Sequence, residues 1–161
     1  MRVCLIIPPS PFLLDERVFV QLGILKIASA LEEQNYTVDM IDLSGVENYT
    51  DVLTDYTKRK DRADVFGITA TPPQVPYAVK ISQHIKALLP AKQSKVILGG
   101  PHVTLMHTAA KREAKKNLVG SDRATKDVEA LKSFFDVLVC GDGEIAIFDA
   151  IHEDMKIIDA D

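Results

Sequence analysis

Five short runs rich in aliphatic and β-branched residues recur along the 161-residue chain. Each run is short enough to form a β-strand, and several are apolar throughout instead of alternating between apolar and polar residues. Uninterrupted runs of this kind are typical of strands that are covered on both faces, as in parallel sheets. The runs occupy residues 3–7, 37–43, 65–69, 95–98 and 137–140.

Helix-like stretches separate these runs. Apolar residues at helical spacing form two stripes, one of Val20, Ile24, Ile27, Ala28 and Leu31 and the other of Ala78, Ile81, Ile85 and Leu88. Strands that alternate with helices favour right-handed β-α-β units with helices on both faces of the sheet. The sequence therefore predicts an α/β fold, a flavodoxin-like and Rossmann-like doubly wound sheet of five parallel strands in the order 2-1-3-4-5.

Two further regions have a weaker pattern. The spacing of apolar residues within 48–62 predicts a modest amphipathic helix followed by a charged turn. Residues 106–135 form a longer stretch than one crossover needs, and we expect two helices there, separated near Gly120 and Ser121. After Ile151 the chain becomes polar, and no further element is expected.

Charge and hydropathy argue against several partners. The formal net charge is −4, and positive and negative residues are intermixed, so no broad positive surface is expected for a nucleic acid. The apolar run at residues 3–7 is far shorter than the roughly 20 residues that span a bilayer. We expect neither a nucleic acid nor a membrane as partner, and a cytoplasmic location.

The two cysteines, Cys4 and Cys140, each lie in a predicted strand. In the expected strand order they are three strand spacings apart, roughly 14 Å. A disulfide needs Cα atoms within about 7 Å. Both are therefore predicted to be buried, reduced thiols, and neither belongs to a metal-binding motif.

The loop after the first strand begins Pro8-Pro9-Ser10-Pro11 and contains no glycine before Gly23. It therefore lacks the glycine-rich motifs that hold dinucleotides and triphosphates. Apolar side chains of the loop, Phe12, Leu13 and Leu14, suit a large flat ligand or a partner domain. The alternative is a loop that packs only on its own helix.

Small residues and prolines follow the third strand in the run Thr69-Ala70-Thr71-Pro72-Pro73-Gln74. Small side chains let a ligand approach the backbone closely. The alternative is a helix entry in which a threonine caps the first turn and the prolines fix the backbone.

A pair of glycines follows the fourth strand, in Gly99-Gly100-Pro101-His102. Adjacent glycines at the end of a buried strand make room for a group that passes close to the backbone. His102 follows the glycines, and a single histidine in such a loop is more often a hydrogen-bonding residue than a metal ligand. No histidine has the spacing of a zinc site, so no metal site is predicted.

After the fifth strand, Gly141-Asp142-Gly143-Glu144 opens a helix. The two carboxylates either complement the positive end of that helix or contact a ligand. All four loops follow the carboxyl ends of parallel strands, where ligands bind in folds of this class. They are therefore expected on one rim.

Short motifs at the strand ends and in the segments that follow them occur in an order that resembles a known family. The set comprises Pro8-Pro9, Leu22-Gly23-Ile24-Leu25, Asp42-Leu43, Thr69-Ala70-Thr71, Gly99-Gly100-Pro101-His102 and Gly141-Asp142-Gly143-Glu144. With it, residues 2–151 resemble the cobalamin-binding N-terminal domain of radical S-adenosylmethionine enzymes. The resemblance implies a cobalamin whose corrin ring lies across the carboxyl edge of the sheet and whose dimethylbenzimidazole tail enters a crevice.

In that family a hydroxylated turn, matched by Thr69 and Thr71, contacts the tail, and paired glycines, matched by Gly99 and Gly100, make room for it. The cofactor-binding residues that the resemblance implies are Pro9, Ser10, Thr69, Ala70, Thr71, Pro72, Gly99, Gly100, Pro101, His102, Gly141, Asp142, Gly143 and Glu144. Residues 1–151 would form this domain. Residues 152–161 would begin a linker to a radical S-adenosylmethionine barrel, the expected partner.

One departure from related domains concerns the cobalt. Cobalamin domains of the methionine synthase and mutase type have an Asp-x-His-x-x-Gly motif after the first strand, and nothing of the kind lies between Pro8 and Leu22. The resemblance then implies base-off cobalamin without a histidine ligand from this loop. The same absence also fits a cobalamin-free accessory domain that docks the barrel and shapes substrate access.

The other departure concerns catalysis. Two cysteines cannot supply the three-cysteine motif that holds the family's iron–sulfur cluster, so the cluster and S-adenosylmethionine would belong to the barrel alone. The chain by itself is expected to be inert. A third hypothesis, an independent flavodoxin-like enzyme or phospho-acceptor domain, lacks an acidic cluster after the first strand, which ends in Pro8-Pro9.

Overall fold

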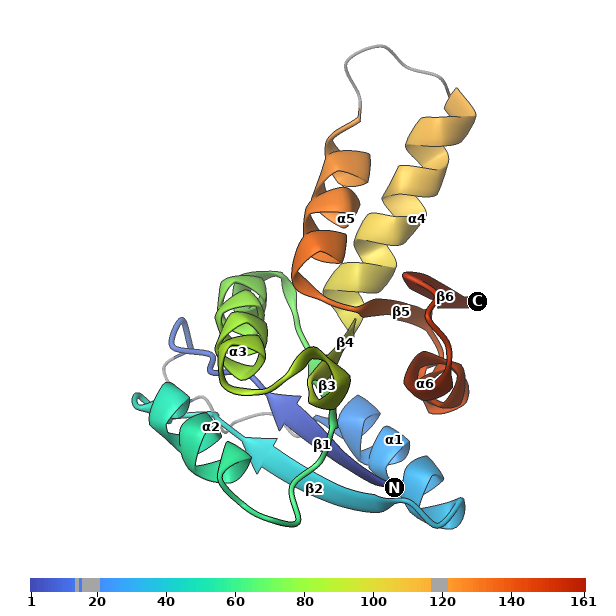
Figure 1. Cartoon of the computed structure of the whole chain (residues 1–161). Helices are drawn as coiled ribbons and strands as arrows, with labels where there is room; N and C mark the ends of the chain where they lie inside the picture. The colour runs from blue at the N-terminus through green and yellow to red at the C-terminus, as the bar shows by residue number, and fades with distance from the viewer. Residues whose placement is uncertain (14, 16–20, 117–121) are drawn as a thin grey trace.

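A parallel sheet forms the centre of the computed structural model, which describes residues 1–13, 15, 21–116 and 122–161 (Figure 1). Within this described part the sheet has six strands in the order β2-β1-β3-β4-β5-β6. Every neighbouring pair is parallel. The strands are β1 (Arg2–Ile7), β2 (Thr37–Asp42), β3 (Val65–Thr69), β4 (Lys95–Gly99), β5 (Val137–Gly141) and β6 (Ile157–Ala160).

The predicted flavodoxin-like fold is confirmed, with a correction to the number of strands. Five strands form where the apolar runs predict them, and their order is the predicted one. The sixth, β6, lies within residues 152–161, where no further element was expected, and it pairs with β5. Its four residues, of which Ile158 is buried, are too few and too mixed with charge to form a recognisable apolar run.

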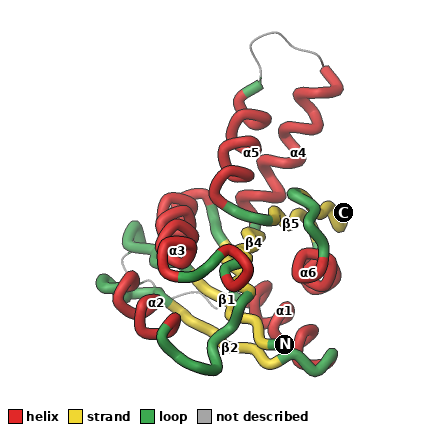
Figure 2. The backbone as a smooth tube through the Cα atoms, viewed as in Figure 1, coloured by secondary structure: helices red, strands yellow, loops and turns green. Residues whose placement is uncertain are grey.

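Helices cover both faces of the sheet (Figure 2). They are α1 (Leu22–Glu33), α2 (Tyr49–Thr57), α3 (Val75–Leu88), α4 (Pro101–Lys116), α5 (Arg123–Phe134) and α6 (Gly143–His152), with short 3-10 turns at Pro72–Gln74 (η1) and Ala91–Gln93 (η2). The side chains of α1 and α6 pack on one face of the sheet, and those of α2, α3, α4 and α5 pack on the other.

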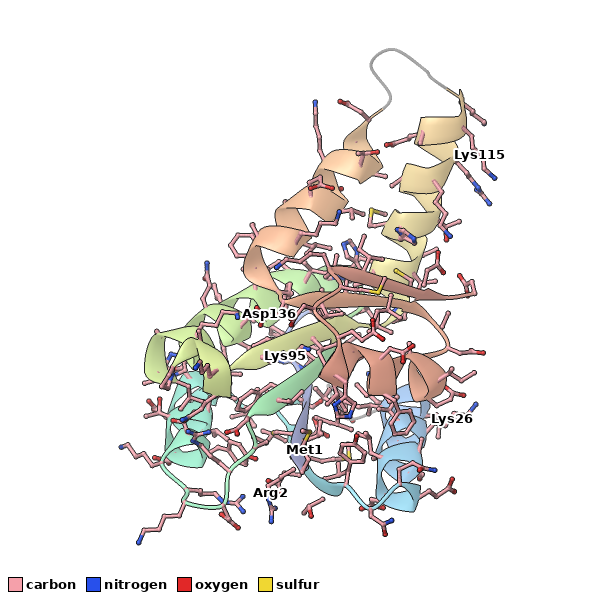
Figure 3. All side chains as sticks on the ribbon, turned by 45° about the vertical axis from the view of Figure 1, so that its right-hand side comes forward. Met1, Arg2, Lys26, Lys95, Lys115 and Asp136 are labelled. Carbon is pink, nitrogen blue, oxygen red and sulfur yellow. The ribbon has the colours of Figure 1, made fainter. Side chains whose placement is uncertain are left out.

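The long crossover between β4 and β5 contains two helices, α4 and α5, as predicted. They form a hairpin that rises away from the sheet (Figure 1), and Lys115 lies toward its outer end (Figure 3). The predicted division at Gly120 and Ser121 falls outside the described residues, as do Leu14 and Val20. Among the described residues, no helix is long and apolar enough to cross a bilayer.

The sheet separates two hydrophobic cores. Leu5, Ile97 and Val139 point to the α1–α6 face, whereas Phe66 and Leu98 point to the opposite face. Alternate residues of each strand therefore enter different cores, although most of the strand residues are apolar.

Both cysteines are buried, as predicted, and both are free. Two strands, β3 and β4, lie between β1, which carries Cys4, and β5, which carries Cys140. Burial raises the pKa of the Cys4 thiol to about 12 and that of the Cys140 thiol to about 11. At neutral pH both groups are therefore protonated and poor nucleophiles.

Candidate functional site

A crevice of about 270 Å³ opens at the carboxyl edge of the sheet, on the face that α1 and α6 cover. Its lining comes from β1, β3, β4 and β5, from the first two turns of α1 and α6, and from the first residue of α4. Figure 3, in which Lys26 marks α1, shows α1 and α6 next to each other on this face. Three separate crossovers thus converge on one site, as the strand order requires.

The floor of the crevice is apolar. Leu5, Gly67 and Ile97 line it from three neighbouring strands, and they lie side by side in the register of the sheet. Gly67 has no side chain to fill the space between its neighbours, and a Cβ atom there would lie 2.9 Å from Cδ2 of Leu5. The missing side chain therefore deepens the crevice.

The walls of the crevice are also largely apolar. Ile24 and Ile27 of α1 line one side, Ile147 of α6 lines another, and Val139 lines the crevice from β5. At Gly143, where α6 begins, a Cβ atom would lie 2.8 Å from Cδ1 of Ile27. This glycine allows α6 to approach α1 closely.

Most of the rim consists of residues that the sequence predicts as ligand contacts. The predicted residues that line the crevice are Thr69, Gly99, Gly100, Pro101, Gly141, Asp142, Gly143 and Glu144. They come from the ends of β3, β4 and β5 and from the turns that follow. Together with Gln21, the side chains of Thr69, Asp142 and Glu144 give the mouth a polar character that the floor lacks.

The paired glycines after β4 have different structural roles. Gly100 has a φ of +102°, and a Cβ atom there would lie 2.7 Å from Oγ1 of Thr69 and 2.9 Å from the backbone nitrogen of Ala70. At Gly99 the nearest atoms to such a Cβ, Cβ and O of Val139, are 3.8 Å away. A side chain at position 100 would therefore meet both an unfavourable φ and close neighbouring atoms, so this position requires glycine. Gly99 has no such constraint, and the lack of a side chain there leaves open space in the crevice.

The remaining predicted residues lie outside the crevice lining: Pro9, Ser10, Ala70, Thr71, Pro72 and His102. Several of them hold the loops together. Gln74, only 2% exposed, donates hydrogen bonds to the carbonyl of Pro8 (3.1 Å) and to Oγ of Ser10 (2.8 Å). Its Oε1 accepts hydrogen bonds from the backbone N–H and the hydroxyl of Thr71, each at 3.1 Å.

Thr71 is thus the residue that precedes η1, and Pro72 is the first residue of that turn. These two positions are those of the alternative interpretation, in which a threonine and the prolines form the entry to a helix. Gln74 links this entry to the loop after β1, so two of the four rim loops share one buried hydrogen-bond network.

His102 lies in the first turn of α4, and its Nδ1 is buried without a hydrogen-bond partner in the described part of the chain. Burial lowers the pKa of His102, although the negative charge of Asp127 acts in the opposite direction. Its ring is therefore neutral at physiological pH.

Sequence reasoning missed the floor and the contribution of α1. The unpredicted lining residues include Leu5, Gln21, Gly23, Ile24, Gly67 and Ile97. One signal was available, because a glycine inside an apolar strand, such as Gly67 in Val65–Thr69, indicates a close approach of another group.

Metal coordination by the chain is not suggested by its described residues, which contain no group of three or more His, Cys, Asp or Glu that could hold an ion. The apolar floor and the glycines point instead to an organic ligand that enters from the edge of the sheet.

Three comparisons with known proteins give one match. No curated protein and no solved structure matches the chain. The family model of the B12 binding domain matches residues 16–125, well over half of the chain. The matched segment contains Gly67, Thr69, Gly99 and Gly100, all of which line the crevice. The chain belongs to the B12-binding domain family.

Proposed function

We propose that the crevice binds the nucleotide tail of a cobalamin whose corrin ring lies over the carboxyl edge of the sheet. The observation that carries this proposal is the apolar, glycine-lined crevice at that edge, in a member of the B12-binding domain family. Its volume, about 270 Å³, is below the roughly 300–1,000 Å³ of sites that enclose a whole drug-sized ligand. It therefore suits one end of a larger molecule.

The residues of the crevice fit such a tail. The floor of Leu5, Gly67 and Ile97 can bury a flat aromatic base. At the mouth, the side chains of Gln21 and Thr69 can hydrogen-bond to the ribose or to the amide groups of a corrin. Cobalamin, when bound, supplies organometallic chemistry at its cobalt, and these residues would position it and keep water from its tail.

Exposed apolar side chains near the crevice support the proposed position of the corrin ring over the carboxyl edge of the sheet. Phe12 is 51% exposed in the loop after β1, Leu22 is 67% exposed at the start of α1, and Ile145 is 64% exposed in the first turn of α6. Each follows the carboxyl end of a strand. Exposed apolar groups at a ligand site offer contact area to a flat partner.

We further propose that the cobalamin is base-off and receives no histidine ligand from the loop after β1, because the sequence has no histidine between Pro8 and Leu22. His102 follows β4 and does not line the crevice, so it is not assigned this role either.

The proposed parent is a radical S-adenosylmethionine enzyme whose barrel follows residues 152–161 and holds the iron–sulfur cluster. The shared loop residues support this assignment. The last strand, β6, is parallel to β5, and a Cβ atom on Gly141 would lie 2.6 Å from Oδ1 of Asp161. A barrel attached after Asp161 would emerge beside the crevice.

Titration of the chain with hydroxocobalamin, followed by visible absorption, tests the binding proposal. We expect saturable binding with the spectrum of the base-off form. Gly99→Val, which fills the crevice without strain at φ, should weaken binding at least about tenfold. Ala87→Val on the exposed side of α3 is the control and should not change affinity.

Failure of both the wild type and the control to bind cobalamin would overturn the proposal and favour the cobalamin-free accessory role. Binding with a base-on spectrum would overturn the base-off assignment alone.

A further inference from the structure

The floor of the crevice offers no polar partner to a ligand. Leu5, Gly67 and Ile97 belong to β1, β3 and β4, and each of these strands pairs with a neighbour on both sides. Their backbone N–H and C=O groups are therefore used within the sheet. The two side chains present, of Leu5 and Ile97, are apolar.

Polar side chains of the lining are confined to the mouth. Thr69 ends β3, Gln21 precedes α1, and Asp142 and Glu144 flank the start of α6. Gly67 and Thr69 are two residues apart on the same face of β3, with Thr69 at the carboxyl end, so the Thr69 hydroxyl lies at the next position toward the mouth. A ligand group that reaches the floor must be apolar, or it loses its hydrogen bonds to water without replacement.

We infer that the crevice selects corrinoids by their lower base, and that Gly67 sets the depth to which the base enters. This inference rests on the proposed function. The structure favours dimethylbenzimidazole over a purine such as adenine. Dimethylbenzimidazole has two methyl groups and one free ring nitrogen, whereas adenine in the same position has three free ring nitrogens and an amino group.

On the apolar floor, burial of the two methyl groups of dimethylbenzimidazole is favourable because it removes apolar surface from water. The ring nitrogens and the amino group of adenine would lose their hydrogen bonds to water there and find no partner. We expect cobalamin to bind at least about tenfold more tightly than the adenine-containing analogue, pseudocobalamin. Cobinamide, which has no lower base, contacts only the mouth and should bind more weakly than cobalamin.

Gly67→Ala tests the role of depth. The added Cβ would lie 2.9 Å from Cδ2 of Leu5, the far end of a flexible side chain that can move. The substitution therefore shortens the crevice while the sheet keeps its backbone. Cobalamin affinity should fall about tenfold or more, and cobinamide affinity should change less than about twofold, because cobinamide places nothing on the floor.

The experiment measures the affinities of the 161-residue chain for cobalamin, pseudocobalamin and cobinamide by isothermal titration calorimetry. Wild type, Gly67→Ala and Ile85→Val are compared. Ile85 is fully buried on the opposite face of the sheet, so its variant changes core packing without touching the crevice. We expect Ile85→Val to retain the wild-type order of the three ligands.

Equal wild-type affinities for cobalamin and pseudocobalamin would overturn the inference while leaving the proposed function in place. A folded Gly67→Ala that binds cobalamin as the wild type does would overturn the assignment of depth to Gly67. If none of the three ligands binds the wild type, the proposed function itself fails. If Gly67→Ala does not fold, the wild-type comparison of the two lower bases still decides the selectivity.

Discussion

A Cβ atom on Gly100 would lie 2.7 Å from Oγ1 of Thr69, across the rim of the crevice. Thr69 ends β3 and Gly100 directly follows the neighbouring strand β4, and the backbone of Gly100 also has a φ of +102°. The N–H of Ala70, next to Thr69, donates a hydrogen bond of 3.2 Å to the carbonyl of Gly99. The rim therefore requires glycine at one position, whereas its neighbour Gly99 is sterically free.

Gly100→Ala should destabilise the fold by about 2–4 kcal/mol, because the new side chain meets both an unfavourable φ and close backbone atoms. Gly99→Ala is the matched control and should change the free energy of unfolding by less than about 1 kcal/mol, because its Cβ has ordinary contacts. Urea unfolding measures both. Similar losses in the two variants would contradict the different roles assigned to them.

Replacement of Gln74 by leucine should cost about 1–3 kcal/mol, because it removes the buried donor to Pro8 and Ser10 and the acceptor for Thr71. Gln83→Leu, on the exposed side of α3, is the control and should stay within about 0.5 kcal/mol of wild type. Urea unfolding again gives the comparison, and equal stabilities of the two variants would show that the network contributes nothing.

Cys4 and Cys140 should not react with a thiol reagent at pH 8 in the folded chain, because burial raises the pKa of each thiol well above that pH. Both should react once the chain is unfolded in urea. Absorbance of the released chromophore counts the thiols in each state. Rapid labelling of the native chain would contradict the burial of these side chains.

The raised thiol pKa also makes stability depend on alkaline pH. Between the ordinary value of 9.0 and the folded value of about 12, Cys4 keeps its proton in the folded state and loses it in the unfolded state. The free energy of unfolding therefore decreases as the pH rises through this range. Cys4→Ala should show a smaller decrease than wild type, and an identical pH dependence would contradict the shift.

His102 should titrate below its ordinary pKa of 6.5, because burial disfavours the charged ring. The unfolded state then binds more protons than the folded state as the pH falls below 6.5, so stability is lost toward acid pH. His102→Asn should lose less stability than wild type between about pH 7 and pH 5. An NMR titration midpoint at or above 6.5 for His102 would contradict the expected direction.

The sheet and most of the rim could be predicted from the sequence for a physical reason. Buried parallel strands need uninterrupted apolar runs, and the carboxyl ends of such strands lie on one edge of the sheet. Residues such as Gly99 and Asp142 could therefore be assigned to a common rim from their position after a run alone.

The floor could not be predicted in the same way. Leu5 and Ile97 are chemically indistinguishable from the other aliphatic residues of the strands, and only the register shows that they face a crevice. Thr71 and Ser10 follow the correct strands, but the buried amide of Gln74 holds both. A loop sequence does not show which of its polar groups satisfy one another and which remain for a ligand.

The most direct test of the crevice as the cobalamin site is the amide NMR spectrum of the chain during titration with hydroxocobalamin. We predict that the largest chemical-shift changes occur at Gly67, Gly99 and Gly143, on the face covered by α1 and α6. Changes confined to α2 and α3 on the opposite face, or an unchanged spectrum with excess cobalamin, would contradict the assignment.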